Sequence, residues 1–442
     1  MPPRRPKMPL SGLLTKSFHL AVILGNLLRL TFSWLLRGAF QRPAPQNAPK
    51  RILVLAYTAV GDSIFLLPAL QALRRGLPDA HITCLGNSYP STAELLPATD
   101  VADEFWTIEA PYGYHQAPAP MLRKIREGRF DAVLVSLPAS ARFFGSSLFS
   151  IPLRVGHCRP IEAPHTGWSW PRYALWRLRR GIIAEEFERR LIFNSKVWVR
   201  EDDEHMTTRN LRLVQALGLS TPEAATCRPA LPRADEAIVF ADQVLKPAPR
   251  ERTVGLHIGS PHSQYAKVWA PERWGAVCRE LAATDRLRVV LLGGPDEAEL
   301  PARFESAFQG PYVNMVGRCG LLKSLELIRR CDLFLGNDTG LSKAAMALGV
   351  PTVAVWGPSD RPGYGIVWNP ERHLEIHHQL PCSPCIRMGL RNEGDGVINF
   401  ANCGHRACLN ELSVQEVVDS IRRRYQPLLS QNGPKPPSAF GS

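Results

Sequence analysis

The sequence predicts an α/β protein built from two doubly wound domains, each with a parallel sheet between two layers of helices. Short continuous apolar runs alternate with helical stretches, which is the pattern of a parallel sheet. This alternation occurs twice, once from residue 51 and again from near residue 253. The length of 442 residues exceeds what one ordinary core covers and fits two domains with tails.

The first alternation predicts strands at 51–56, 81–85 and 131–136 and helices at 63–75 and 205–217. Gly218 is expected to stop the second of these helices. Residues 154–200 are rich in Arg, Trp and Pro, and the pattern does not order their elements.

The second alternation predicts strands at 253–258, 287–292, 331–335 and 351–356 and helices at 271–283, 341–348 and 413–425. Pro271 suits the first position of its helix, and Gly349 is the expected stop of the next one. Ser413 and Glu416 form a capping box that opens the last helix.

Residues 1–49 differ from the rest, with a basic start and then an apolar stretch. Only twelve uncharged residues separate Lys16 from Arg29, fewer than the ~20 that a membrane-spanning helix needs. Asn26, Arg29, Ser33 and Arg37 fall on one helix face. We expect an amphipathic helix over 17–37 that lies in a membrane surface. A helix packed on the protein itself and a signal peptide or anchor are the alternatives, and Arg29 argues against the latter.

The formal net charge of +13 predicts anionic partners. Phosphates, nucleic acid and anionic lipid all meet this description. The sequence lacks a Lys/Arg run with interleaved aromatic residues, which disfavours nucleic acid. Six of the ten cysteines stand among apolar neighbours, which is typical of buried thiols in a reducing compartment.

Residues 335–352 carry the sharpest motif, a strand, a small polar turn and the start of a helix. Free N–H groups and the helix dipole favour an anion at such a start, and ligands of open α/β sheets lie beyond the carboxyl ends of the strands. Thr339 adds a hydroxyl, and Gly340 lets a phosphate approach the main chain. The alternative is that Asp338 only caps the helix.

Two further loops follow predicted strands. In residues 259–274, Ser260 and Lys267 could meet a diphosphate by hydrogen bond and by charge, although a loop lysine is also often simply solvated. In residues 58–70, Asp62 stands where a strand meets a helix and could accept a proton from an attacking hydroxyl. Its alternative role is again a helix cap. Neither a G-x-G-x-x-G nor a Walker motif is present, which disfavours an NAD-type oxidoreductase.

Together these segments resemble the heptosyltransferases of glycosyltransferase family 9, which act in lipopolysaccharide core assembly. The resemblance covers about residues 50–425 and rests on VGDSIFLLPALQALRRGLPDA, HMTTRNLRLVQALGL, GSPHSQYAKVWAPERW and GNDTGLSKAAMALGVPTVAVWGPSD. It implies the GT-B fold, two Rossmann-like domains that face a central cleft. It also implies an inverting, metal-independent transfer from a nucleotide-sugar, ADP-heptose in the family, to a hydroxyl of a glycolipid acceptor.

The resemblance assigns roles to single residues. It implies that Asp62 is the base and that an acidic residue after the Gly-Gly loop, Glu297 or Glu299, holds the ribose. It places the donor's diphosphate on Ser260, Lys267, Asp338, Thr339 and Gly340. This chain has Lys343 where the family usually has His, and a fixed cation there would bind the donor through phosphate. With Lys267 and the helix start, it would stabilise the leaving diphosphate in place of a metal.

The resemblance also divides the chain and places it in the cell. We expect a membrane-surface segment over 1–49, an acceptor-side domain over 50–235, a nucleotide-sugar-binding domain over 236–428 and a disordered tail over 429–442. The location implied is the cytoplasm, peripheral on the inner face of the bacterial cytoplasmic membrane. A catalytically inactive nucleotide-binding protein with the same fold is the alternative function.

Four further cysteines cluster near the end of the sequence, namely Cys382, Cys385, Cys403 and Cys408. A C-x2-C pair followed by two more cysteines resembles a four-thiolate structural zinc site, with His405 as a spare ligand. The C-x4-C spacing of the second pair is looser than usual, so packed or unpaired thiols are the preferred interpretation, and a zinc site is the alternative. The family resemblance requires no cofactor.

Overall fold

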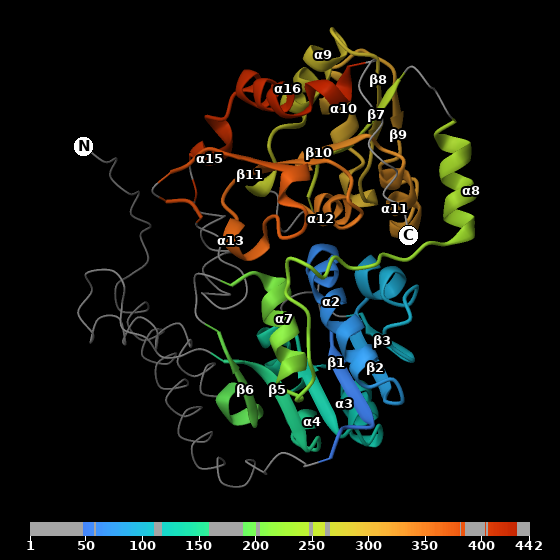
Figure 1. Cartoon of the computed structure of the whole chain (residues 1–442), viewed down its shortest axis with the longest axis vertical. Coiled ribbons are helices and arrows are strands. Elements are labelled where there is room, and N and C mark those ends of the chain that lie inside the picture. Colours follow the sequence, from blue (N-terminus) through green and yellow to red (C-terminus); the bar gives the residue numbers. More distant parts are fainter. Residues whose placement is uncertain are drawn as a thin grey trace, which may run out of the picture.

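The computed structural model describes residues 47–56, 59–109, 117–158, 189–199, 204–246, 251–260, 266–380, 382–384, 403 and 405–430. Within them lie two six-stranded sheets, each with helices packed around it (Figure 1). This confirms the predicted pair of doubly wound, Rossmann-like domains. The amphipathic helix expected over 17–37 lies outside the described residues, as does the expected tail from residue 431 onward.

The first sheet has the strand order β3-β2-β1-β4-β5-β6, and all its neighbours are parallel. Its strands are β1 (Arg51–Leu55), β2 (His81–Asn87), β3 (Glu104–Ile108), β4 (Ala132–Val135), β5 (Leu153–Cys158) and β6 (Ser195–Trp198). The order reverses between β1 and β4, which makes their carboxyl ends the switch point where such sheets bind ligands.

The second sheet repeats this topology with the order β12-β11-β10-β7-β8-β9. Its strands are β7 (Arg252–His257), β8 (Leu287–Leu291), β9 (Tyr312–Asn314), β10 (Leu333–Asn337), β11 (Thr352–Trp356) and β12 (His373–His377). They too are all parallel, and the switch point lies between β7 and β10.

The helices follow the strands as the alternation predicted. The first domain has α2 (Val60–Gly76), α3 (Ala119–Glu127), α4 (Pro138–Leu148), α7 (Met206–Gln215) and the π-helical turn η1 (Ser91–Leu95). The second has α8 (Asp235–Val244), α9 (Pro271–Ala282), α10 (Leu300–Glu305), α11 (Leu321–Arg329), α12 (Gly340–Ala347), α13 (Arg361–Tyr364), α15 (Ala407–Asn410), α16 (Val414–Leu429) and the 3-10 turns η3 (Pro295–Glu297) and η4 (Pro370–Arg372). Among the helices that the structure describes, none is long and apolar enough to cross a membrane.

β3, β6, β9 and β12 lie where no strand was predicted, and three further segments also differ from the expectation. β10 begins at Leu333 instead of residue 331, because Asp332 accepts a hydrogen bond from the backbone of Thr253 and ends the preceding turn. The last helix continues beyond residue 425 because Leu429 is buried in the second core. β5 lies where no order was predicted, since Arg154 interrupts its apolar pattern and yet is buried, donating to two backbone carbonyls.

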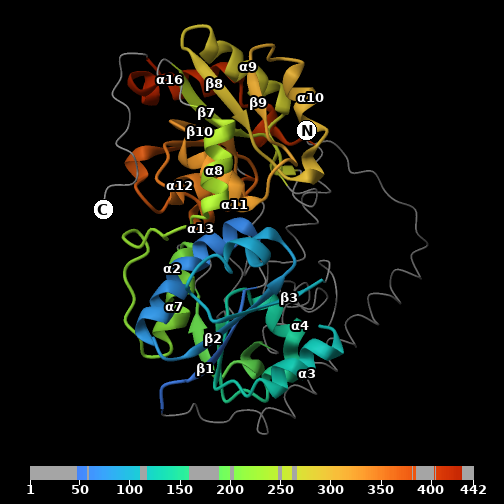
Figure 2. The ribbon, with the colours of Figure 1, turned by 90° about the vertical axis from the view of Figure 1, so that its right-hand side faces the viewer.

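The two domains share one continuous hydrophobic core, to which α2 and α7 contribute from the first domain and α11 and α12 from the second. In both views α2 lies directly below α12 (Figures 1 and 2). The Glu94 carboxylate accepts a hydrogen bond from the Leu321 N–H at the start of α11, at 2.7 Å. His205 Nε2 lies 3.2 Å from the carbonyl oxygen of Gly365. The domains are therefore joined by apolar and polar contacts on both sides of α2.

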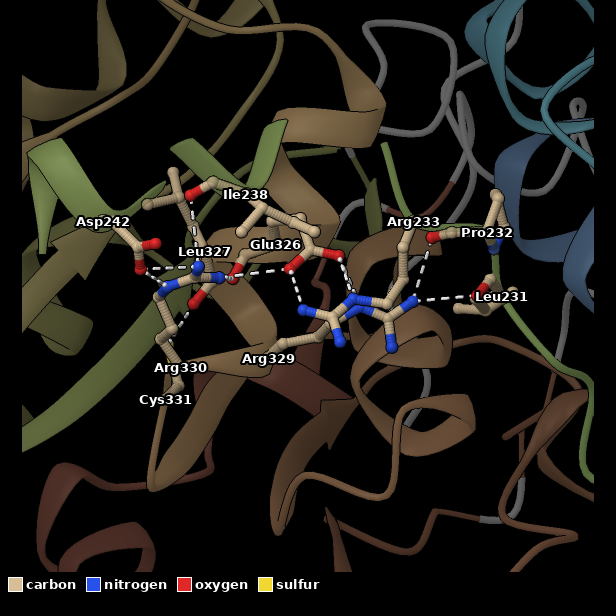
Figure 3. A network of polar contacts seen from close by, with 10 residues as sticks. All are labelled: Leu231, Pro232, Arg233, Ile238, Asp242, Glu326, Leu327, Arg329, Arg330 and Cys331. Atoms are coloured by element: carbon tan, nitrogen blue, oxygen red, sulfur yellow. Dashed lines mark hydrogen bonds and ion pairs between the residues drawn. The ribbon is translucent and has the colours of Figure 1, made fainter. Parts of the chain in front are cut away.

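The connection from α7 to α8 is attached to the second domain by a buried polar network (Figure 3). The side chain of Glu326, 1% exposed, pairs with Arg329 at 2.9 Å and with Arg330 at 3.1 Å. It also pairs with Arg233 of the connection at 3.3 Å. Arg329 donates to the carbonyls of residues 231 and 232, both at 2.9 Å. The network thus fixes the end of the interdomain connection to α11.

Candidate functional site

The candidate site lies where the starts of α2 and α12 meet. Each helix follows a strand at its sheet's switch point, so the two carboxyl edges face each other. A Cβ added to Gly61 would lie 3.6 Å from the Cα of Gly340. A Cβ added to Gly340 would lie 2.9 Å from the Cβ of Val60, closer than real Cβ atoms approach. Glycine at position 340 therefore permits the two helix starts to come this close.

Asp62 stands in the first turn of α2, three residues after the N-cap Ala59. Its carboxylate accepts a hydrogen bond from the Ala59 N–H, as an acidic third residue does in a capping box. Burial raises the pKa of Asp62, and the opposing charges of Lys267 and Lys343 offset this only in part. The carboxylate predicted as the base therefore lies close to two cations of the other domain, and its raised pKa suits proton transfer.

Asp338 holds both of these lysines. It is 4% exposed and makes an ion pair with Lys343, while Lys267 Nζ lies 3.4 Å from its Oδ2. Although burial opposes ionisation, the two cations bring the pKa of Asp338 down to about 2. Lys343 Nζ also lies 4.2 Å from the centre of the Trp356 ring, a cation–π contact. The N-cap of α12 is Thr339, so Asp338 positions cations and does not cap the helix.

Asn337 joins the turn before α12 to the loop that carries Lys267, a role that the sequence analysis did not assign. Its side chain donates to the Ile258 carbonyl at 2.9 Å and accepts from the Trp269 N–H at 3.1 Å. The Trp274 indole N–H is a second donor at 3.3 Å. These contacts explain why two segments far apart in sequence place their cations on one carboxylate.

Ser260 and Glu297 lie at the same edge of the second sheet but differ in their hydrogen bonding. The buried Ser260 hydroxyl has no hydrogen-bond partner among the described residues, which leaves it available to a ligand oxygen. Glu297 is already engaged, because its Oε2 accepts from the Gly294 N–H and from His257 Nε2, both at 3.0 Å. Glu299, its alternative for the ribose, is exposed. His257 was not predicted as a site residue. A polar residue at the end of a central strand could have indicated it, because ligands bind at the carboxyl edge of such sheets.

The alternative of a zinc site at the four C-terminal cysteines receives no support from the described residues. Cys382 is exposed, Cys403 is half-buried and Cys408 is buried, whereas Cys385 lies outside the described residues. No group of three or more His, Cys, Asp or Glu side chains in the described part of the chain is placed to hold a metal ion. Of the six scattered cysteines, Cys84, Cys158, Cys278 and Cys331 are buried as predicted, and Cys227 and Cys319 are half-buried.

The sequence is similar to those of two bacterial heptosyltransferases. Lipopolysaccharide heptosyltransferase 1 of Escherichia coli is 23% identical over 332 residues, which cover 70% of this chain and 88% of that protein. Lipooligosaccharide heptosyltransferase 2 of Campylobacter jejuni is 22% identical over 180 residues, which cover 40% of this chain. The match spans about half of that relative's own length, 52%.

A solved structure shows the same architecture. E. coli ADP-heptose LPS heptosyltransferase II superposes with a TM-score of 0.57 at 20% identity, over 86% of this chain and 98% of that one. This likeness shows the GT-B fold. The sequence model of glycosyltransferase family 9 (heptosyltransferase) matches residues 174–394, half of the chain. The chain therefore belongs to the heptosyltransferases of glycosyltransferase family 9.

Proposed function

We propose that this protein transfers a heptose-like sugar from an ADP-sugar to a hydroxyl group of a glycolipid of the lipopolysaccharide-core type. The observation that carries the proposal is that Asp62 of one domain lies within electrostatic reach of Lys267 and Lys343 of the other. This proximity supports a proton acceptor and a diphosphate site that meet where the two helices start. The names of the relatives, an ADP-heptose LPS heptosyltransferase among them, support the donor and the acceptor class.

In the proposed reaction, Asp62 accepts the proton of the acceptor hydroxyl as its oxygen attacks the anomeric carbon. Attack comes from the face opposite the nucleotide, so the configuration at this carbon inverts. The bond from the anomeric carbon to the diphosphate oxygen breaks, and the diphosphate leaves with additional negative charge. Lys267, Lys343 and the N–H groups at the start of α12 would stabilise that charge, which fits a transfer without metal.

The proposed function is tested by mixing the protein with ADP-heptose and a lipopolysaccharide core that lacks heptose. We expect release of ADP together with a sugar-extended acceptor of inverted anomeric configuration. Binding of ADP without transfer to any core acceptor would instead favour the catalytically inactive nucleotide-binding protein.

Lys267→Ala is expected to weaken ADP binding by ~1.5–3 kcal/mol, the range for a hydrogen bond to a charged group. The melting temperature should change little, because Asp338 keeps its ion pair with Lys343. Isothermal calorimetry and thermal unfolding measure the two effects. Lys246→Ala, at an exposed lysine on the connection between α8 and β7, is the matched control and should bind ADP normally. Equal affinities of the two variants would contradict a role in donor binding and leave Lys267 only its ion pair with Asp338.

We also propose that residues 17–37 hold the protein on the inner face of the cytoplasmic membrane. The apolar face and the basic flank of this segment are those of an interfacial helix. The full chain is expected to sediment with anionic vesicles, and a chain that starts at Lys50 is expected to remain in the supernatant. Added salt should weaken the binding, because part of it is electrostatic. Equal sedimentation of both chains would contradict the proposal.

A further inference from the structure

A cluster of aromatic rings joins α2 and α7 of the first domain to α13 of the second, at the boundary between the domains (Figures 1 and 2). Phe65 of α2 is its centre. The centre of the Phe65 ring lies 4.7 Å from that of His205 and 6.2 Å from that of Tyr364. The Trp368 ring is the fourth member, at 5.7 Å from Phe65. The end of α13 therefore packs on α2 itself.

The face of α2 that meets α13 is the face that carries Asp62. Asp62 and Phe65 are three residues apart in this helix, so their side chains project from the same side. Tyr364, which ends α13, contacts Phe65 on that side. The second domain therefore brings a phenol to the helix face of the proposed base.

The position of Tyr364 is held from the first domain by the N-cap residue of α7, His205. Burial lowers the pKa of His205 to about 4, so its ring is neutral at pH 7. Its Nδ1 accepts from the Thr207 N–H at 3.1 Å, and its Nε2 therefore carries the ring proton. Nε2–H donates to the carbonyl of Gly365 at 3.2 Å. This bond fixes the backbone directly after Tyr364.

The Tyr364 ring is 9% exposed, and its hydroxyl makes no hydrogen bond within the described part of the chain. Burial raises the pKa of Tyr364 well above its ordinary value. The charge of Asp62 acts in the same direction, followed by those of Asp360 and Asp338, and Arg209 opposes them. The hydroxyl therefore keeps its proton and lies within electrostatic reach of two carboxylates of the candidate site.

The proposed reaction indicates what lies between those two carboxylates. The acceptor oxygen and the leaving diphosphate stand on opposite sides of the anomeric carbon. Asp62 takes the proton of the first, and the lysines that Asp338 holds stabilise the second. A group near both Asp62 and Asp338 therefore borders the space that the transferred sugar occupies. A phenol hydroxyl both donates and accepts, as the hydroxyl groups of a sugar do.

We propose that Tyr364 is a binding residue for the transferred sugar and that its hydroxyl makes a hydrogen bond with a hydroxyl group of that sugar. Phe65 and His205 are then positioning residues, because they act on the sugar only through Tyr364. The contact distinguishes a nucleotide-sugar from the bare nucleotide, which lacks the bonded group. This inference rests on the proposed function, since its ligand is the sugar of the donor.

Calorimetry with ADP-heptose and with ADP, each in the absence of acceptor, tests the proposal on Tyr364→Phe. The phenylalanine ring keeps the packing on Phe65, and the lost hydroxyl has no partner within the described residues, so the melting temperature should stay the same. We expect ADP-heptose to bind about 3- to 10-fold more weakly, which is the loss of one neutral hydrogen bond. The affinity for ADP should equal that of the native protein. A merely structural role would not separate the two ligands.

Tyr425→Phe is the matched control. Tyr425 of α16 is 6% exposed, and its hydroxyl donates to the carbonyl of Arg372 at 2.9 Å. That hydroxyl lies near the beginning of β11, 3.4 Å from the Thr352 carbonyl, at the sheet edge opposite the candidate site. Both ligands should bind this variant as they bind the native protein.

The outcomes separate this inference from the proposed function. If Tyr364→Phe bound ADP-heptose with native affinity, or lost as much affinity for ADP as for ADP-heptose, the sugar contact would be wrong and the proposed transferase would stand. If the native protein bound neither ligand, the proposed function and this inference would both be wrong.

Discussion

Asp62→Asn is expected to lower the rate of sugar transfer by about 10²–10⁴-fold, the usual cost of removing a general base. The asparagine side chain keeps the size of aspartate, and its oxygen can still accept from the Ala59 N–H at the start of α2. It cannot take a proton at neutral pH. Because burial raises the pKa of Asp62, the charge itself is a cost to the folded state, so the melting temperature should stay the same or rise slightly.

Single-turnover assays with saturating ADP-heptose measure this loss separately from donor binding. Asp79→Asn, at an exposed position beyond the end of α2, is the matched control and should transfer at the native rate. In the native protein the rate should rise with pH through the raised pKa of Asp62, since only the ionised form accepts a proton. A variant that melts far below the native protein would make Asp62 mainly structural. If Asp62→Asn transferred sugar at the native rate, another residue would be the base.

Glu326→Ala is expected to lower the free energy of unfolding by ~3–5 kcal/mol, the range for breaking a buried ion pair by removing one partner. The carboxylate lies almost fully inside the protein between the guanidinium groups of Arg329, Arg330 and Arg233. Without it, the buried guanidinium of Arg329, which is 7% exposed, loses its carboxylate partner, whereas Arg330 keeps Asp242 and Arg233 is 46% exposed. Urea unfolding measures the change, and a lower melting temperature should accompany it.

Glu236→Ala is the control for this prediction, because Glu236 pairs with Lys323 at 2.9 Å on the surface between α8 and α11. Its melting temperature should equal that of the native protein, since exposed ion pairs contribute little. If Glu326→Ala unfolded at the same urea concentration as this control, the network would have no part in stability.

The sequence predicted those parts of the fold whose apolar pattern is uninterrupted. The runs at β1 and β11 were found because the last four residues of each strand are apolar and buried. β5 was missed because an arginine side chain usually lies in solvent. Here Arg154 is buried and donates to the nearby carbonyl of Ile151 and to that of Ile192, which is 38 residues further along the chain. Hydrogen bonds that satisfy a buried guanidinium group depend in part on tertiary contacts, so the local sequence pattern does not reveal them.

For the candidate site, the sequence predicted which positions lie together but not which side chains contact one another. Asp62, Lys267 and Asp338 follow strand ends, and parallel strands bring such positions to one edge. The direction of a side chain at that edge is not encoded locally. The contact between Glu297 and His257 was not predicted, because it depends on the pairing of β7 with β8. The roles of His257 and Asn337 arise from the same pairing of segments.

The close approach of Gly61 and Gly340 bears on the timing of turnover. A phosphate seated on the main chain at the start of α12 needs space beside Val60 and Gly61, and here the two helix ends already touch. If the donor phosphate binds there as proposed, we expect each exchange of nucleotide to require α2 to withdraw from α12, against the shared core and the bond from Glu94 to α11. Opening and product release are then expected to limit the rate of turnover, as in many enzymes whose domains close over substrate. If opening limits turnover, the steady-state turnover rate is expected to fall as solvent viscosity rises. The rate of sugar transfer within the closed complex is expected to stay the same.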